Sequence, residues 1–223
     1  MATYRASAAG GSTSGTSDRT CTITPAAGDL FIVVCGVSVN TNTAPTCSDN
    51  NGGTYSLITT ARKATSADTM SVFVRNQFLT NTTSTTVTVA TGSNTSGAVH
   101  VIAVSGMFRT ALDAIVKSAR QENQAAGTPA PAFSASALTG NLTVGAVCNA
   151  TNPAGMTTPT NWLERQDTGF STPSIGLETV TRDSGFTGTT VTWGSASASA
   201  YCSLIVELDA SAMTLMGAQL EFD

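Results

Sequence analysis

Short runs of apolar and β-branched residues alternate with turns rich in Gly, Asn, Asp and Pro along most of the chain. Residues 85–89, Thr-Thr-Val-Thr-Val, show the period of two that is typical of a strand with one face in solvent. Residues 30–35, Leu-Phe-Ile-Val-Val-Cys, are apolar throughout, as in a strand that is covered on both faces. Similar β-rich segments occupy 20–24, 54–64, 69–78 and 98–104. The pattern predicts an all-β protein.

The same order of segments occurs twice. Gly28-Asp29-Leu30 is matched by Gly140-Asn141-Leu142, and each triplet opens an apolar run that contains a cysteine. Four more segments recur in the same order, 54–57 as 161–164, 70–75 as 175–180, 85–89 as 189–193, and 99–104 as 203–208. Composition alone rarely produces such an order, so the sequence predicts an internal duplication with halves at about 19–106 and 131–209.

The linker between these halves, residues 107–130, has two interpretations. Leu112, Ile115, Val116 and Ala119 have the spacing of one amphipathic helix. The alternative is an extended crossover that ends in the proline-containing segment 127–131. The spacing leaves both open, and at most one short helix is predicted for the whole protein.

Both ends of the chain lie outside the repeat. Residues 1–18 are rich in Ala, Gly, Ser and Thr, a composition that predicts a flexible arm. Residues 210–223 form an apolar tail, which is expected to pack on this chain or on a neighbouring subunit. The tail residues predicted to contact another subunit are Met213, Leu215, Met216, Leu220 and Phe222.

Charge changes the picture of the surface more than of the fold. Only 11% of the 223 residues are charged, against roughly a quarter in a typical soluble protein, and the net charge is −4. A weakly charged surface of hydroxyls and amides suits a protein within an assembly, and with no basic run we expect no nucleic-acid partner. No apolar stretch has the length of a membrane span, and no signal peptide is predicted, so synthesis in a cytoplasm is expected.

The five cysteines are Cys21, Cys35, Cys47, Cys148 and Cys202. Buried apolar thiols are the favoured interpretation, and no pair has the Cys-x-x-Cys spacing of a zinc site. If a disulfide forms, Cys148 and Cys202 are the best pair, because each lies in a long apolar strand of the second half.

The common parts of a catalytic site are scarce. His100 is the only histidine, and a lone histidine in a strand is expected to be a packing residue. Glu164, Asp167, Glu178 and Asp183 could supply the carboxylate pair of a glycoside hydrolase, but surface charges at strand ends explain them better. We therefore predict no catalytic residues, no enzyme activity and no cofactor.

Two further groups of residues have side chains that are common in binding sites. Asp49-Asn50-Asn51 offers oxygen ligands for calcium, but a turn is the stronger interpretation, so no metal site is predicted. Trp162, Trp193 and Tyr201 have the chemistry of a sugar-stacking platform, whereas Trp162 and Tyr201 are better explained as core residues.

Several short motifs resemble a known family of duplicated β-sandwich domains in tailed-bacteriophage virion proteins and some bacterial surface proteins. The motifs are Ala27-Gly28-Asp29-Leu30, the turn at 48–55, Thr158-Pro159-Thr160-Asn161-Trp162 and Leu112-Asp113-Ala114. The resemblance covers about residues 19–209 and implies an antiparallel β-sandwich of jelly-roll or lectin-like type. Its motifs are architectural, with a doubled Gly in the first turn where the family usually has Gly-Asn.

The leading hypothesis is a structural protein on the surface of a bacteriophage virion, as a capsid decoration or cement protein or a neck or tail component. Its expected partners are other virion proteins and copies of itself. The alternative is a carbohydrate-binding adhesion module with a host surface glycan as partner, and a hydrolase is a distant third. No membrane partner is expected.

Overall fold

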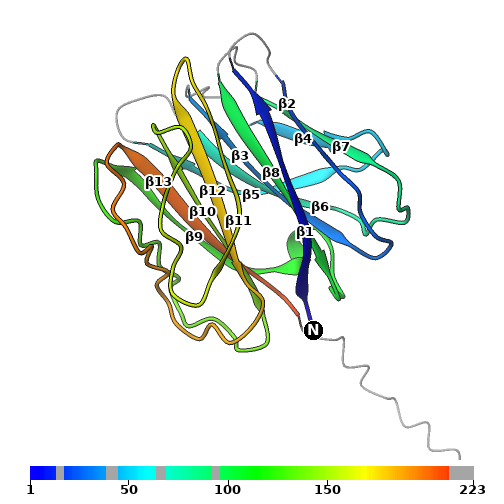
Figure 1. Ribbon diagram of the computed structural model, residues 1–223. Helices are drawn as coiled ribbons and strands as arrows, with labels where there is room; N and C mark the ends of the chain where they lie inside the picture. Colours follow the sequence, from blue (N-terminus) through cyan, green and yellow to red (C-terminus); the bar gives the residue numbers. More distant parts are fainter. Residues whose placement is uncertain (14–17, 39–44, 64–68, 92–95, 211–223) are drawn as a thin grey trace, which may run out of the picture.

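The computed structural model describes residues 1–13, 18–38, 45–63, 69–91 and 96–210. Thirteen strands and one short 3-10 helix make up this described part of the chain (Figure 1). Every strand pairing in the three sheets is antiparallel. The prediction of an all-β, sandwich-like fold is confirmed.

The first half contains two of the three sheets. Its five-stranded sheet has the order β1 (Thr3–Ser12), β8 (Gly97–Ser105), β3 (Leu30–Val37), β6 (Thr69–Arg75) and β5 (Tyr55–Arg62). Its three-stranded sheet has the order β2 (Asp18–Ile23), β7 (Thr85–Ala90) and β4 (Thr46–Asp49). This small sheet lies on the right in Figure 1.

The second half contains the other five-stranded sheet, on the left in Figure 1. Its order is β11 (Leu163–Phe170), β12 (Ile175–Arg182), β10 (Leu142–Asn149), β13 (Tyr201–Leu208) and β9 (Ile115–Gln124). Read from the other edge, this is the order of the first sheet strand for strand, with β9 in the place of β1 and β13 in the place of β8. The edges also meet in equivalent pairs, because β1 contacts β11 and β5 contacts β9.

The apolar residues form three clusters between four layers. One cluster lies between the two five-stranded sheets and includes Ile32 and Val144. A second lies between the first five-stranded sheet and the small sheet, and it includes Phe31 and Val87. The third covers the outer face of the second five-stranded sheet. β3 therefore has apolar neighbours on both faces, which explains why its sequence does not alternate.

In the second half, loop segments take the place of the small sheet. Residues 129–133 run beside 189–193, where the N–H groups of Phe133, Val191 and Trp193 donate to main-chain carbonyls at 2.9, 3.1 and 3.0 Å. Only one isolated β-bridge, Ala132 to Thr190, is formed along this pairing. The third apolar cluster lies beneath these segments and includes Trp193.

The turn before the central strand of each half is fixed by a basic residue from its edge strand. In the first half Arg5 of β1 pairs with Asp29, whose Oδ2 also accepts the N–H of Ala26 at 2.7 Å. In the second half Lys117 of β9 lies 3.0 Å from Glu207 Oε2, and Glu207 Oε1 accepts the amide of Asn141 at 2.7 Å. Asp29 and Asn141 are the matched residues of the two repeats.

The prediction that residues 1–18 form a flexible arm is wrong for β1. β1 pairs with β8 from Thr3 to Ser12, so its main-chain groups on the side of β8 are satisfied within the sheet. The glycines that suggested flexibility serve close packing, because a Cβ on Gly10 would lie 2.2 Å from the carbonyl oxygen of Thr20 in β2. Residues 14–17 lie outside the described residues.

The predicted linker at 107–130 is also corrected, since most of it is the edge strand β9. Helical structure is limited to η1 (Ala111–Ala114), and residues 115–124 are extended. The side chains along β9 alternate in burial because one face packs on the body, and this period overrides the helical spacing. Each half therefore begins earlier than the sequence predicts, because β1 and β9 come before the predicted starts at residues 19 and 131.

Candidate functional site

Asp167 and Glu178 are the two candidate carboxylates that the fold brings together, as directly opposed residues of β11 and β12. Both are engaged with one loop. Asp167 Oδ1 and Oδ2 accept the N–H groups of Ala154 and Gly155 at 2.9 and 3.1 Å. Glu178 Oε2 accepts the N–H of Met156 at 2.9 Å, and Oε1 accepts Trp193 Nε1–H at 3.1 Å. The carboxylates therefore hold the loop at 154–156 against the sheet.

Burial governs the protonation of these two groups. Glu178 is fully buried, and burial raises its pKa to about 7, although the hydrogen bonds from Trp193 and Met156 lower it and the charges of Asp167 and Glu164 raise it. Burial also raises the pKa of Asp167, against the hydrogen bonds from Gly155 and Ala154. The other two candidates do not join this pair, because Glu164 is exposed at the start of β11 and Asp183 follows β12.

The carboxylate of Asp49 is occupied by four donors, in support of the turn interpretation over calcium. Oδ1 accepts the N–H groups of Asn51 and Gly53 at 2.9 and 2.8 Å. Oδ2 accepts Tyr55 Oη–H at 2.9 Å and Arg75 Nε–H at 2.8 Å. Burial acts to raise the pKa of Asp49, but these hydrogen bonds and the charge of Arg75 lower it below its usual value.

His100 is a packing residue at the interface of the two halves. It is fully buried on β8, and its Nδ1 lies 3.1 Å from Thr179 Oγ1 of β12. Burial lowers its pKa to about 3, so the ring is neutral at ordinary pH. No hydrogen-bond partner in the described part of the chain reaches its buried Nε2.

The three aromatic residues considered for sugar stacking are all in the third apolar cluster. Trp162, Trp193 and Tyr201 are 6%, 2% and 2% exposed. Trp162 packs edge-on against Phe186 with ring centroids 5.4 Å apart, and Tyr201 Oη donates to the carbonyl of Thr128 at 3.0 Å. They therefore form no platform for a ligand.

The fold places Cys148 of β10 directly opposite Cys202 of β13, and both thiols are free and fully buried. A hydrogen bond from Cys202 lowers the pKa of Cys148 and, with the charge of Lys63, outweighs the effect of burial. The same hydrogen bond and burial raise the pKa of Cys202. The two residues are paired across the strands without a bond between the sulfur atoms, and the disulfide stays a prediction.

Mild oxidation of the folded protein with hydrogen peroxide is expected to join Cys148 to Cys202. Opposed residues of antiparallel strands have Cβ atoms roughly 4.5–5.5 Å apart, slightly more than the roughly 3.5–4.5 Å of a disulfide, so a small strand shift suffices. Peptide mapping without reductant should recover this one link, and the C148S variant should lack it. Only free thiols after oxidation, or a link between the halves, would contradict the prediction.

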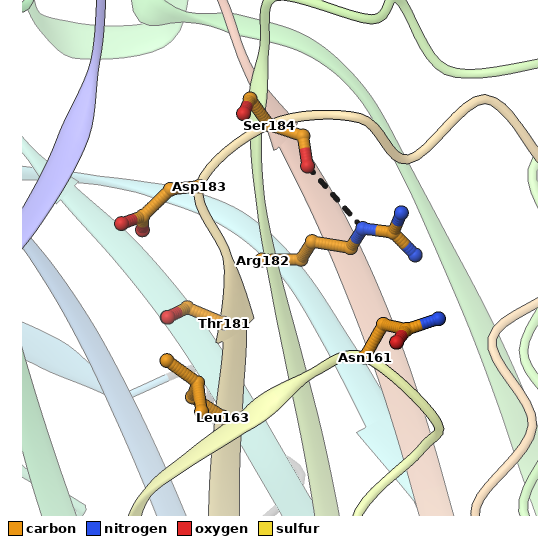
Figure 2. A pocket seen from close by; sticks show the side chains of 6 residues that line it. All are labelled: Asn161, Leu163, Thr181, Arg182, Asp183 and Ser184. Carbon is orange, nitrogen blue, oxygen red and sulfur yellow. Dashed lines mark hydrogen bonds between the residues drawn. The ribbon is translucent and has the colours of Figure 1, made fainter.

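An open pocket lies where β11 and β12 separate, past the pair Leu163–Thr181 (Figure 2). Its volume is 520 Å³, within the roughly 300–1,000 Å³ range typical of small-ligand sites. Its lining residues, drawn in Figure 2, are Asn161, Leu163, Thr181, Arg182, Asp183 and Ser184. Leu163, the one apolar side chain among them, is 60% exposed.

The polar side chains of this pocket are held in place by neighbouring groups. Asp183 Oδ1 accepts the N–H of Tyr4 at 3.1 Å. Arg182 donates from Nε to the carbonyl of Ser184 at 3.2 Å, the bond drawn in Figure 2, and from Nη2 to that of Gly185 at 2.7 Å. Thr181 Oγ1 accepts Arg165 Nε–H at 2.7 Å, and the Arg165 guanidinium lies 3.5 Å from the centre of the Tyr4 ring.

Comparison with models of protein families, with characterised proteins and with solved structures gives no match. Within the described residues, no group of three or more His, Cys, Asp or Glu side chains is placed to hold a metal ion. No helix in the same part of the chain is long and apolar enough to cross a membrane. The predicted subunit-contact residues Met213, Leu215, Met216, Leu220 and Phe222 lie outside the described residues.

Proposed function

We propose that the protein is a structural component of the surface of a bacteriophage particle, either a capsid decoration or cement protein or a neck or tail component. The observation that carries the structural role is what the candidate catalytic and metal-binding carboxylates do in the fold. Asp49, Asp167 and Glu178 each accept main-chain N–H groups and hold turns and loops in position. The motif at 27–30 supports the virion assignment through its resemblance to virion proteins.

Because the faces of the sheets are covered within the protein, neighbouring subunits are expected to bind at the ends of the chain. The two five-stranded sheets pack on each other, and their remaining faces are covered by the small sheet and by the loops of the second half. No broad apolar sheet face is left within the described residues for a partner. We therefore assign the contact with neighbouring subunits to the segment that follows Ala210.

The point where this segment leaves the body is fixed. The N–H of Ala210 donates to Asn141 Oδ1 at 3.0 Å, and the N–H of Asp209 donates to the carbonyl of Ala114 at 2.8 Å. Arg109 Nε lies 3.3 Å from Asp209 Oδ2. A rigid exit of this kind would transmit the attachment of residues 211–223 to the whole body.

Removing residues 211–223 is expected to abolish attachment to particles while the body stays folded. Phage particles would be purified on a density gradient from a lysate of the bacterium that produces the protein. They would be tested for the full and the shortened chain by mass spectrometry and immunogold labelling. The full chain should band with the particles, and the shortened chain should stay in the soluble fraction with an unchanged thermal unfolding midpoint. A full chain found only in the soluble fraction would refute the proposed function, and a shortened chain that still binds would refute the assignment of the contact.

A further inference from the structure

We propose that the pocket between β11 and the turn after β12 binds a neutral saccharide. This inference goes beyond the structural role and does not depend on it, because the pocket belongs to the folded body. Its lining brings together a carboxylate, an amide, two hydroxyls and a guanidinium around one exposed leucine. Few apolar groups and many hydrogen-bonding groups favour a ligand that is itself rich in hydroxyls.

Several polar atoms of the pocket are left for a ligand. Asn161 and Ser184 make no side-chain hydrogen bond to the described residues. Asp183 Oδ1 accepts the N–H of Tyr4 and lies 3.9 Å from Arg165 Nη2, which leaves Oδ2 for a ligand. An ionised carboxylate oxygen accepts hydroxyl groups, while an amide both donates and accepts. Asp183 and Leu163 lie on one side of β12 and Asn161 on the other (Figure 2), so a saccharide of more than one ring could reach both, with its apolar C–H groups on Leu163.

The charge of the lining selects against ionic ligands. Arg182 and Asp183 carry opposite charges, and the guanidinium of Arg165, beside the lining residues, lies 3.9 Å from Asp183 Oδ1. The charge of Asp183 is therefore already paired within the protein. Arg182 directs Nε and Nη2 at the main-chain carbonyls of Ser184 and Gly185, which leaves it poorly placed for a bidentate contact with an anion. A cationic ligand would meet the charge of Arg182 beside that of Asp183. A neutral ligand avoids both conflicts.

The pocket is also organised before any ligand binds. Asn161 has φ 67°, a left-handed conformation that is uncommon for a residue other than glycine. The turn that holds it is closed by the N–H of Trp162, which donates to the carbonyl of Pro159 at 3.0 Å, and the buried Trp162 ring fixes the turn on the third apolar cluster. Asn161 is thereby held at the mouth of the pocket (Figure 2).

The test uses the isolated full chain and neutral trisaccharides built from glucose, galactose, mannose or N-acetylglucosamine, with binding followed by NMR and calorimetry. At least one should bind saturably and shift resonances of residues 161–163 and 181–184. D183N keeps an acceptor for Tyr4 and should weaken binding about tenfold or more, and N161G, which suits the left-handed backbone, by about two- to tenfold. D113N makes the same chemical change at an exposed site outside the pocket and should leave binding unchanged.

Three results would overturn the saccharide site. These are no binding by any of the trisaccharides, binding that both pocket variants leave intact, and shifts confined to other residues. Because no particle is present in the assay, each result bears on the pocket alone. Failure of the attachment experiment, in turn, would leave the saccharide result standing.

Discussion

The D49A variant is expected to lose about 3–5 kcal/mol of unfolding free energy, because it strands a buried arginine. The side chain of Arg75 is 7% exposed and that of Asp49 is 0% exposed, so water cannot replace the lost carboxylate. The same change removes the acceptor of the Asn51 and Gly53 N–H groups, which close the turn between β4 and β5. Urea unfolding of wild type and D49A, monitored by circular dichroism, measures the difference.

Two controls separate the ion pair from the turn. D113A changes an exposed aspartate and should alter stability by no more than about 0.5 kcal/mol. Adding R75M to D49A removes the stranded charge and should recover part of the loss, because a buried pair replaced by apolar groups is often tolerated. A loss below about 1 kcal/mol in D49A would show that the pair contributes little. A rise in stability with calcium, absent in chelator, would restore the metal interpretation of the turn.

The core of the fold could be predicted from the sequence because burial leaves a direct pattern. The continuous apolar run of β3 indicated a strand covered on both faces, and β7 shows the expected alternation, with Val87 and Val89 buried. The strand orders of the two five-stranded sheets match as well, and Asp29 and Asn141 have equivalent places. In these segments local pattern and tertiary packing agree.

The edge strands could not be predicted in the same way. β1 contains many small residues because β2 and β8 approach its backbone closely. Small residues are also typical of flexible segments, so the composition of β1 predicts a flexible arm instead of a strand. β9 carries charged side chains, as edge strands often do, and its apolar residues coincide with a helical spacing. Both strands are defined by their neighbours rather than by their own composition.

The pocket could not be predicted for a related reason. Asn161 lies in the turn before β11 and Leu163 is the first residue of that strand. Arg182 ends β12, and Asp183 and Ser184 follow it, about twenty residues later. Neither segment has a motif for binding, and only the pairing of β11 with β12 brings them together. The aromatic residues drew attention instead, but their size places them in the core.

Glu178 and His100 are expected to make opposing contributions to the pH dependence of stability between about pH 4.5 and 6.5. The pKa of Glu178 rises from 4.5 to about 7 on folding, so the folded state binds more protons across that window and stability falls as pH rises through it. The pKa of His100 falls from 6.5 to about 3, so the unfolded state binds more protons there and stability falls as pH decreases through that window. Where the two windows overlap, the slopes cancel.

Replacing Glu178 by Gln should remove the fall in stability with rising pH that Glu178 causes. The rise in stability that His100 causes should then be measurable. The pKa change of Glu178 from 4.5 to about 7 corresponds to about 3 kcal/mol, so E178Q should gain about that much relative to wild type between pH 4.5 and 8. Urea unfolding of both proteins across this range measures the gain. The amide of E178Q beside the Trp193 and Met156 donors has a cost that does not depend on pH. This cost cancels when the difference in unfolding free energy at pH 8 is compared with the difference at pH 4.5. E122Q, at a partly exposed carboxylate on β9, should run parallel to wild type. If E178Q also runs parallel to wild type, the pKa of Glu178 is the same in the folded and unfolded states, and the prediction is wrong.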